Sequence, residues 1–412
     1  MQFCAKVRTL TIKVVLLKYN ENWVQRYSNI VKQTSNTLGN SKILFILHLP
    51  PPVHGAAMVG KYIHDSESVN SKFGCHYINL TTASSLEDMG HVGWKKVKAF
   101  WFLLQKIRHS VQEQRPDLVY VTPNAKGGAF YKDFVVVMML KQMGCRVVVH
   151  YHNKGVVTRQ DQWLDNLLYR RFFKGLKVIL LAEALYPDIQ KYVKREDVYI
   201  CSNGIPMTEE KKGTHEDNVV PRLLFLSNLL VDKGVMILLD ALKILKDKNL
   251  SFVCDFVGGE TEDINAKRFA DEISKRGLNE IALYKGKKYG EDKDEEFANS
   301  DVFVFPTFYH NECFPLVLLE AMQHGLPIVT TDEGGIADIV KDGENGFIVE
   351  RQSSQQLAEK IAILIDDKEL RSRLGERGYQ LFHEKFTLKV FEERFVETLT
   401  EIIRNREGDK GY

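Results

Sequence analysis

The sequence has few cysteines and no pattern that would pair them. Six cysteines occur among 412 residues, they lie far apart, and no C-x-x-C pair is present. This spacing argues against a zinc ribbon and a disulfide scaffold, and it favours a reducing, cytoplasmic setting. A chain of this length suggests two or three domains, which can form cores without such crosslinks.

Long apolar runs are also missing. No run reaches the roughly 18 to 20 residues that a membrane-spanning helix needs. The apolar segment Thr9–Tyr19 carries Lys13 and Lys18, and no small-residue cleavage site follows it. We therefore expect an extension here rather than a secretory signal. The sequence also lacks an Asp-x-Asp motif at a predicted strand end and any recognised nucleic-acid-binding motif. We expect neither a bound metal ion nor a nucleic-acid partner.

Positive charge is concentrated in the first half of the chain and negative charge in the second half. The formal net charge is +5 over residues 1–40, +9 over residues 41–205 and −12 over residues 206–412. A basic first half joined to an acidic second half predicts two domains that face different partners.

Short apolar runs alternate with helical stretches, which is typical of βαβ units and a parallel sheet. The polar segment Met207–Val220 lacks periodicity and interrupts this series like an interdomain linker. The pattern predicts an α/β fold with two Rossmann-like parallel-sheet domains facing each other across a ligand-binding cleft. We expect strands at 43–47, 118–121, 146–150, 178–181, 198–201, 222–227, 251–257, 281–285, 301–306 and 327–331. The expected divisions are an extension (1–40), an N-terminal domain (41–206), a linker (207–220), a C-terminal domain (221–386), and a C-terminal helix and tail (387–412) that packs back on the N-terminal domain.

The segment Asp301–Gly335 carries the most chemical information. A predicted strand ends at Pro306, a loop of aromatic and polar residues follows, and a helix begins near Pro315. The free N–H groups of a helix N-terminus suit an anion such as a diphosphate. Glu312 and Glu320 flank this terminus, and carboxylates beside an anion site suit a ligand that also carries hydroxyl groups. Taken singly, Glu312 could be a capping residue and Glu320 a solvated helix position.

This segment resembles the Glu-x7-Glu signature of the retaining glycosyltransferases of family 4, the group 1 glycosyltransferases, which have the GT-B fold. The resemblance extends over roughly residues 41–386. It implies that Glu312 lies at the donor sugar as a catalytic residue and that Glu320 binds the ribose hydroxyls. Glu333-Gly334-Gly335 resembles the family's glycine pair near the donor, with Asp338 where a glutamate is usual. The resemblance also implies that the backbone around Cys313, Phe314, Pro315 and Leu316 holds the donor sugar and phosphates.

A second segment, Ser227–Gly234, resembles the family's Gly-Arg-Leu…Lys-Gly segment, whose Arg and Lys clamp the diphosphate. Lys233 matches the lysine, which implies a catalytic, donor-binding role. Asn228 stands in place of the arginine and cannot make a charged bidentate contact. The resemblance thus implies a weaker clamp, or one that is supplemented by Lys287 or Lys288.

Two N-terminal segments also match. Pro51–Ala56 resembles the glycine-rich first loop near the donor, with Gly55 retained and Ala56 in place of the second glycine. Val147–Asn153 resembles the segment whose histidine contacts the donor sugar. Strand alternation places His150 and His152 on one face, and His152, nearer the cleft, is the catalytic candidate. A structural role is the alternative for either histidine. Asn203-Gly204 matches the family's hinge before the linker.

The resemblance implies a retaining, metal-independent enzyme that moves a sugar from a nucleoside-diphosphate sugar to a glycan. The donor is a substrate, so no cofactor is expected, and UDP is favoured while GDP-mannose remains open. A lipid-linked glycan of cell-surface polysaccharide biosynthesis is the expected acceptor. Two alternatives remain: an isomerase of the same fold, such as a UDP-N-acetylglucosamine 2-epimerase, and a non-catalytic module that binds nucleotide sugars.

Basic and aromatic residues alternate in two segments of the basic half. Trp94–His109 combines three further aromatic residues with five lysines and arginines, and Tyr169–Lys174 repeats the combination. Such mixtures suit a bilayer interface with anionic lipid. We therefore predict a peripheral enzyme on the inner face of the cytoplasmic membrane. The alternative is an amphipathic helix with its aromatic side chains in the core.

Overall fold

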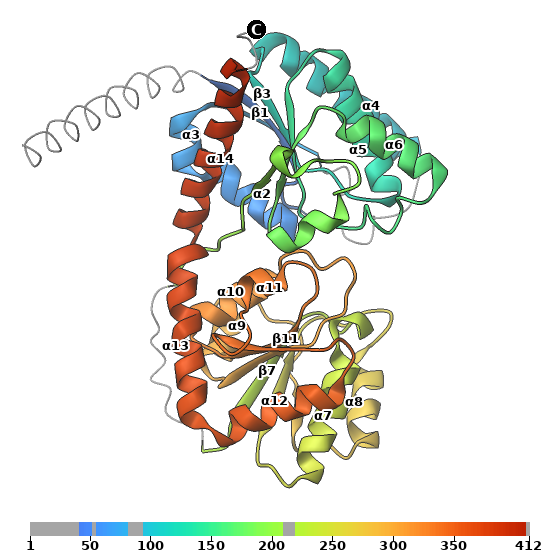
Figure 1. The fold of residues 1–412 in the computed structure, drawn as a ribbon. Coiled ribbons are helices and arrows are strands. Elements are labelled where there is room, and N and C mark those ends of the chain that lie inside the picture. Colours follow the sequence, from blue (N-terminus) through green and yellow to red (C-terminus); the bar gives the residue numbers. More distant parts are fainter. Residues whose placement is uncertain (1–40, 52–54, 81–93, 209–218, 409–412) are drawn as a thin grey trace, which may run out of the picture.

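Two α/β domains, each built on a six-stranded sheet, lie end to end in a computed structural model of the chain (Figure 1). The structure describes residues 41–51, 55–80, 94–208 and 219–408. The predicted extension 1–40 and most of the predicted linker 207–220 lie outside these ranges. Both sheets are parallel throughout, which confirms the prediction of two Rossmann-like α/β domains.

The N-terminal sheet has the strand order β2-β1-β3-β4-β5-β6. Every predicted strand of this domain is present within a residue or two, and only β2 was not predicted. The β2 sequence GCHYIN contains one fully buried residue, Ile78. Because β2 lies at the edge of the sheet, it lacks the apolar run that marks the inner strands. The strands are β1 (Lys42–Leu47), β2 (Gly74–Asn79), β3 (Leu118–Val121), β4 (Val147–His150), β5 (Lys177–Leu180) and β6 (Val198–Ile200).

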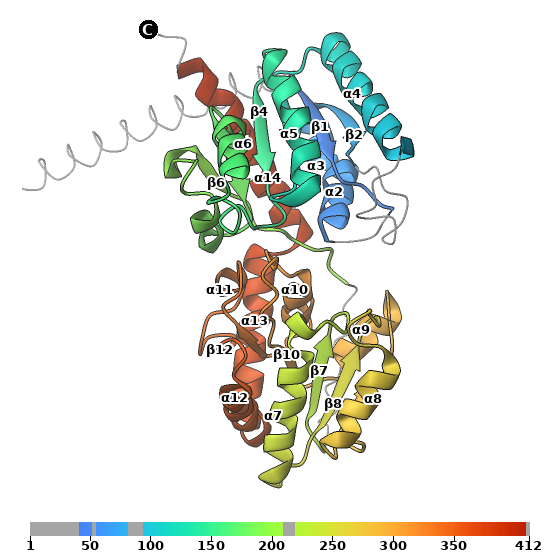
Figure 2. The same cartoon turned by 90° about the vertical axis from the view of Figure 1, so that its right-hand side faces the viewer.

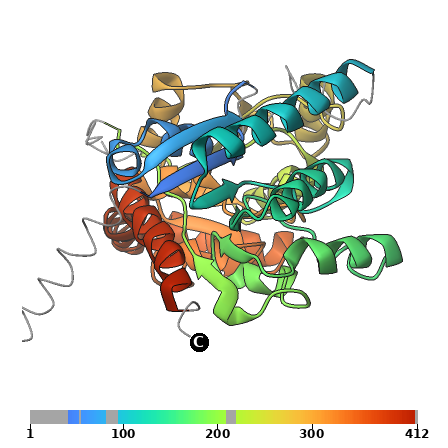
Figure 3. The same cartoon turned by 90° about the horizontal axis from the view of Figure 1, so that it is seen from above.

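Helices cover both faces of this sheet (Figure 2). One face packs against α4 (Trp94–Gln114), α5 (Gly127–Gln142) and α6 (Trp163–Phe173) through buried residues such as Ile107 and Phe130. The other face packs against α2 (Gly55–Asp65), α3 (Glu67–Lys72) and α14 (Leu388–Gly408). Seen from above, the red α14 lies on the opposite side of the sheet from the teal and green helices α4 to α6 (Figure 3).

The two basic–aromatic segments differ in their exposure. Tyr169, Phe172 and Phe173 are buried in the core beneath α6, so the membrane role predicted for the aromatic residues of Tyr169–Lys174 is wrong. Their spacing places them on the inner face of the helix. On α4, in contrast, Trp101 and Phe102 are more than half exposed. Within the described residues, no helix is both long enough and apolar enough to cross a bilayer.

The C-terminal sheet has the order β12-β11-β10-β7-β8-β9, with α7 and α12 packed together on one side and α10 and α13 on the other. The unpredicted strand is again at an edge, β12. The strands are β7 (Arg222–Leu226), β8 (Val253–Val257), β9 (Ala282–Tyr284), β10 (Val302–Phe305), β11 (Ile328–Thr331) and β12 (Gly346–Val349). The helices are α7 (Val235–Asp247), α8 (Ala266–Lys275), α9 (Glu291–Ala298), α10 (Leu316–Gln323), α11 (Ile336–Ile339), α12 (Ser354–Asp366) and α13 (Lys368–Lys385).

The chain passes between the domains twice, and the two passages lie side by side. The Ile205 N–H donates to the Phe386 carbonyl (3.0 Å), and the Leu388 N–H donates to the Ile205 carbonyl (2.7 Å). A Cβ on Gly204 would lie 2.3 Å from the Thr387 carbonyl oxygen, so only glycine allows this close approach. After this crossing, α14 packs on the N-terminal sheet.

Strand order reverses between β1 and β3 in the first sheet and between β7 and β10 in the second. Ligands of open α/β sheets bind outside the carboxyl ends of the strands at such switch points. Both switch points lie toward the other domain, because loops that follow β4 and β11 contact each other across the interface.

Candidate active site

The loops that follow β7 and β10 are joined at the C-terminal switch point. The Phe308 N–H donates to the Asp232 carbonyl at 2.8 Å. Gly234 has φ +84°, and a Cβ there would lie 2.1 Å from the Pro306 carbonyl oxygen. A glycine is therefore required for the two loops to approach this closely. Their contact brings Lys233 beside Glu312.

Lys233 and Glu312 form an ion pair between these loops. The Lys233 Nζ lies 2.5 Å from a carboxylate oxygen of Glu312, and the two side chains are 15% and 10% exposed. The ammonium also lies 4.9 Å from the centre of the Tyr309 ring and 5.2 Å from that of Phe305. An ammonium has three N–H donors, so Lys233 can hold a phosphate oxygen while it contacts Glu312.

Glu320 lies on the second turn of α10 and faces both domains. Its carboxylate accepts a hydrogen bond from Lys293 of α9 at 2.6 Å. Burial raises the pKa of Glu320, while Lys293 opposes this shift. Burial also raises the pKa of Tyr62 on α2, and the charge of Glu320 adds to the effect. Tyr62, which belongs to the N-terminal domain, therefore lies near Glu320, and no sequence motif indicated this.

The backbone between the two glutamates packs against the Gly334-Gly335 turn. Gly334 has φ +61°, and a Cβ there would lie 2.2 Å from the Glu312 carbonyl oxygen. The Gly335 N–H donates to the Cys313 carbonyl at 2.8 Å. The side chains of Cys313, Phe314 and Pro315 are buried, whereas Leu316 is half-buried. A ligand in the cleft would therefore meet the first three of these residues through their backbone.

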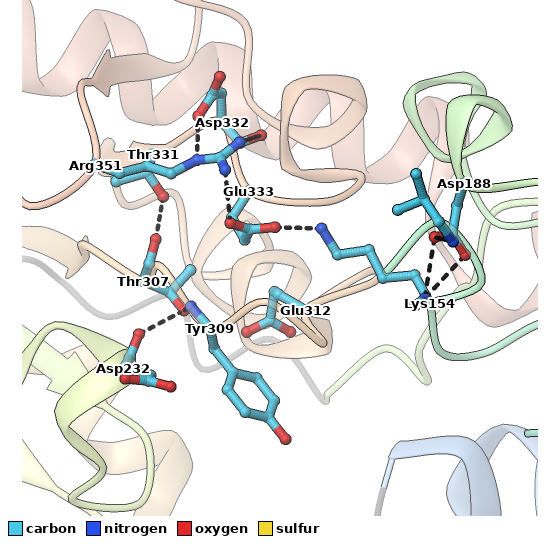
Figure 4. Close-up of polar contacts among 12 residues, drawn as sticks. Lys154, Asp188, Asp232, Thr307, Tyr309, Glu312, Thr331, Asp332, Glu333 and Arg351 are labelled. Carbon is cyan, nitrogen blue, oxygen red and sulfur yellow. Dashed lines mark hydrogen bonds and ion pairs between the residues drawn. The ribbon is translucent and has the colours of Figure 1, made fainter. Parts of the chain in front are cut away.

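An ion-pair network connects this turn to the N-terminal domain (Figure 4). Lys154, from the loop after β4, pairs with Glu333, and Arg351 lies 3.0 Å from the same carboxylate. The Asp338 carboxylate accepts the Ala184 N–H at 3.2 Å, which is a second contact across the domains. Lys154 and Arg351 were not predicted as site residues, because nothing in their local sequence reveals a partner about 180 or 20 positions away.

Asn228 is fixed beside one of the two lysines that were predicted to supplement it. Its side-chain oxygen accepts the Gly259 N–H at 3.3 Å. A Cβ on Gly259 would lie 3.1 Å from this oxygen and 3.6 Å from Cδ of Lys287, so both side chains flank the glycine. Lys288 instead pairs with the buried carboxylate of Glu296. Of the two lysines, Lys287 thus lies beside Asn228, and its part in a phosphate clamp stays a prediction.

The two histidines lie side by side, as strand alternation predicts, with ring centres 4.3 Å apart. His150 is fully buried and shares a 2.7 Å hydrogen bond with the Tyr120 hydroxyl. Burial holds the pKa of His150 well below its usual value, and His152 lowers it further. His152 is half-buried in the loop beyond the strand. His150 thus has the structural role, and a donor-binding role for His152 stays a prediction.

After β1, the glycine that packs closely against the backbone is Gly60, not the predicted Gly55. A Cβ on Gly55 would meet no atom within 4 Å, whereas a Cβ on Gly60 would lie 2.0 Å from the His48 carbonyl oxygen. Gly60 allows α2 to pack on the loop after β1. The remainder of the predicted loop, residues 52–54, lies outside the described residues, and the donor-binding role of Gly55 stays a prediction.

Comparisons with known proteins agree with this geometry. Residues 206–381 match the family Glycosyl transferases group 1. The capsular polysaccharide biosynthesis glycosyltransferase CapM of Staphylococcus aureus is 32% identical over 184 residues, 45% of this chain and 47% of CapM. The N,N'-diacetylbacillosaminyl-diphospho-undecaprenol α-1,3-N-acetylgalactosaminyltransferase of Campylobacter jejuni is 26% identical over 271 residues, 62% of this chain and 68% of the relative. The match to CapM thus spans less than half of its length.

Two solved structures show the same fold over almost the whole molecule. A glycosyltransferase from Rickettsia africae superposes with a TM-score of 0.71 at 16% identity, and the match covers 89% of this chain and 99% of that one. HepE of Anabaena in complex with UDP-glucose gives a TM-score of 0.65 at 19% identity, covering 87% and 99%. The chain has the GT-B fold, and its C-terminal domain matches the group 1 glycosyltransferases.

Proposed function

We propose that the protein is a retaining, metal-independent glycosyltransferase that moves a sugar from a nucleoside-diphosphate sugar, with UDP as the favoured nucleotide, to a glycan acceptor. The observation that carries this proposal is the placement of Lys233, Glu312 and the first turn of α10 together at the C-terminal switch point. This combination of a cation, free backbone N–H groups and a carboxylate suits a diphosphate that is joined to a polyol. HepE, solved with UDP-glucose, supports UDP.

The charges of the site match the charge that develops when the bond between sugar C1 and the diphosphate oxygen breaks. Negative charge grows on the leaving diphosphate, and Lys233, supplemented by Lys287, would stabilise it. Glu312 would lie at the sugar and Glu320 on the ribose hydroxyls, with Tyr62 closing the cleft from the other domain. The acceptor hydroxyl would bond to C1 on the face from which the diphosphate departs, which retains the configuration, and its proton would pass to the leaving diphosphate oxygen. No cofactor is needed, because the nucleotide sugar is itself a substrate.

We further propose a lipid-linked glycan as acceptor and a peripheral position at the inner face of the cytoplasmic membrane. On α4, Val97, Trp101 and Phe102 are 52 to 55% exposed, and the exposed cations Lys98 and Lys106 lie on the same helix. Helix α6, on the same face of the sheet but beyond α5, adds Trp163, which is 77% exposed. Exposed aromatic residues with cations suit a bilayer interface. The Campylobacter relative, named for a diphospho-undecaprenol substrate, supports this type of acceptor.

The test is a thermal-shift screen of the full chain against UDP-, GDP- and ADP-sugars, followed by transfer assays. A ligand at 100 times its Kd stabilises the folded state by about 2.7 kcal/mol, so a selective donor is expected to raise the Tm clearly. The shift should shrink in Lys233→Ala and persist in Lys243→Ala, because Lys243 pairs with Asp247 on the surface of α7. A screen without any nucleotide-dependent shift would contradict the proposal.

The two alternative functions give different results in the same assays. A same-fold epimerase would convert its UDP-sugar without an acceptor. A non-catalytic binding module, which the neutral Asn228 favours, would show the thermal shift without transfer or conversion. Formation of a glycosylated product that requires both donor and acceptor excludes both alternatives.

A further inference from the structure

A second cluster of cations lies in the N-terminal domain, outside the donor site. Lys126 immediately precedes α5, and its side chain crosses the loop 151–157 at Gly155. A Cβ on Gly155 would lie 2.6 Å from Cδ of Lys126 and 3.0 Å from its Nζ. Gly155 has φ +132°, a conformation that also favours glycine. The glycine therefore gives the stem of Lys126 a defined path across this loop.

Two of the three cations in this cluster have a carboxylate partner. Lys154 pairs with Glu333, and Arg159 pairs with Asp165 at 2.8 Å. The side-chain ammonium of Lys126 makes no hydrogen bond or ion pair within the part of the chain that the structure describes.

The nearest acidic group, Asp188, is already engaged by the backbone. Its carboxylate accepts the N–H groups of Gly155, Val156 and Val157 at 2.9 to 3.2 Å, and Figure 4 shows it facing this loop. Burial lowers the pKa of Lys126, Asp188 opposes that shift, and Arg159 and Lys154 lower it further. A bound anion would relieve this repulsion between like charges.

The cluster also lies where a ligand of this domain is expected. Lys126 follows β3, one of the two strands at the N-terminal switch point. Lys154 reaches Glu333, whose neighbour Gly334 packs on the Glu312 backbone. The cations therefore lie beside the turn that packs on the Glu312 backbone, on the side of the N-terminal domain.

We infer that Lys126 and Lys154 bind a phosphate or diphosphate group of the acceptor. This inference rests on the proposed glycosyltransferase function and adds the charged group by which the acceptor is held. The ammonium of Lys126 supplies an unused charge, and Lys154 can share its three N–H donors between Glu333 and a phosphate oxygen. The same phosphate chemistry occurs in a lipid diphosphate and in a soluble sugar phosphate.

Calorimetry on the full chain saturated with UDP tests the site, with inorganic pyrophosphate as the probe. Pyrophosphate is expected to bind the UDP-loaded protein, and Lys126→Ala should weaken this binding at least about tenfold, equivalent to about 1.4 kcal/mol. Lys126→Arg should retain most of it. Lys194→Ala is the matched control, because Lys194 is a surface lysine of the same domain. The UDP affinity should be equal in all four proteins.

Two results would overturn the inference: pyrophosphate that fails to bind once UDP is saturating, or Lys126→Ala that binds it as the unaltered chain does. Either result leaves UDP binding, and thus the proposed function, intact. A chain that binds pyrophosphate through Lys126 but never binds a nucleotide would instead contradict the proposed function alone. Circular dichroism melting of each variant checks that its fold is retained.

Two further probes distinguish the sources of the phosphate. Geranyl diphosphate that binds more tightly than pyrophosphate, with the same dependence on Lys126, would support a lipid-linked acceptor. Glucose 1-phosphate that binds more tightly than either would support a soluble one. Glucuronate that binds through Lys126 while both phosphate probes fail would overturn the inference, because the site would then recognise a carboxylate.

Discussion

Lys233 and Glu312 are largely buried, and each neutralises the other. Sequence spacing predicted a role for both residues but not their direct contact, since they are 79 positions apart. Removal of one partner leaves a nearly buried charge, which is strongly destabilising in general. A functional test at this pair therefore needs a melting measurement on each variant, so that a loss of fold is told apart from a loss of function.

Glu312→Gln is expected to retain nucleotide binding and lower turnover at least about tenfold, an increment of about 1.4 kcal/mol in the barrier. The amide fills the same space but lacks the charge that faces the sugar. Glu320→Ala should instead weaken nucleotide binding, since its carboxylate would hold the ribose. Steady-state kinetics and calorimetry with UDP separate the two effects. Normal turnover in Glu312→Gln would show that this glutamate has no part in the reaction.

The phosphate clamp offers a gain-of-function test. Lys233→Ala should raise the donor KM or lower kcat markedly. Lys287→Ala should weaken UDP binding less, because the exposed Lys287 carries a more solvated charge. Asn228→Arg should tighten UDP, since a guanidinium can contact the diphosphate in a bidentate manner. Calorimetry showing the same UDP affinity in all three variants would refute this account of the clamp.

His150 predicts a pH dependence of stability. Burial lowers its pKa in the folded state, so below about pH 6.5 the unfolded chain binds a proton that the folded chain does not. The free energy of unfolding should therefore fall as the pH drops below that value, by up to about 1.4 kcal/mol per pH unit for this group. Urea unfolding between pH 5 and pH 8 measures the slope. The slope should be shallower in His150→Asn, and an equal slope would assign the effect to other groups.

At the scale of elements, α4 and α6 have a similar composition but differ in which of their aromatic residues are exposed. Both helices mix aromatic and basic residues, and both pack on the same face of the N-terminal sheet. On α6 the paired phenylalanines fill the core, whereas on α4 the inner positions are the aliphatic Leu103 and Ile107. Trp101 and Phe102 therefore remain outside. Composition alone cannot separate these cases, because the position of each side chain around the helix decides its exposure.

Co-sedimentation with vesicles tests the role of α4. The full chain should bind anionic but not neutral vesicles, and added salt should weaken the binding. Lys98→Glu/Lys106→Glu should release it, because each well-placed cation contributes about 1 kcal/mol at such a surface. Lys267→Glu/Lys275→Glu on α8 is the control, since it makes the same charge change in the other domain. Equal recovery in the supernatant with both vesicle types would favour a soluble acceptor.

At the scale of the whole molecule, the C-terminal helix completes the N-terminal domain. Phe395 of α14 is fully buried, and its ring lies 5.4 Å from that of Tyr120 and 6.3 Å from that of His150. Helix α13 lies on the C-terminal domain and α14 on the N-terminal one, so this pair of helices and the Ile205 crossing connect the domains twice.

Phe395→Ala is expected to destabilise the N-terminal domain by about 3 to 5 kcal/mol, because it leaves a cavity among tightly packed rings. UDP binding by the C-terminal domain should change little. Calorimetric melting with and without UDP measures both. Glu397→Ala, on the exposed side of the same helix, is the matched control. A melting profile like that of the unaltered chain would show that α14 does not contribute to the stability of this domain.

Local patterns in the sequence were sufficient for the architecture, and they indicated the candidate donor motif. Short apolar runs predicted ten of the twelve strands, and the two that were not predicted, β2 and β12, both lie at a sheet edge. Glu312 and Glu320 belong to one strand–loop–helix unit, so their spacing alone indicated a common site. Packing between distant segments decides three other features. These are the position of Lys287 rather than Lys288 beside Asn228, the exposure of Trp101 and Phe102 on α4, and the burial of His150. Lys154, Arg351, Tyr62 and Lys126 had no local signal at all, because their neighbours come from other loops or from the other domain, and only the folded chain brings them together.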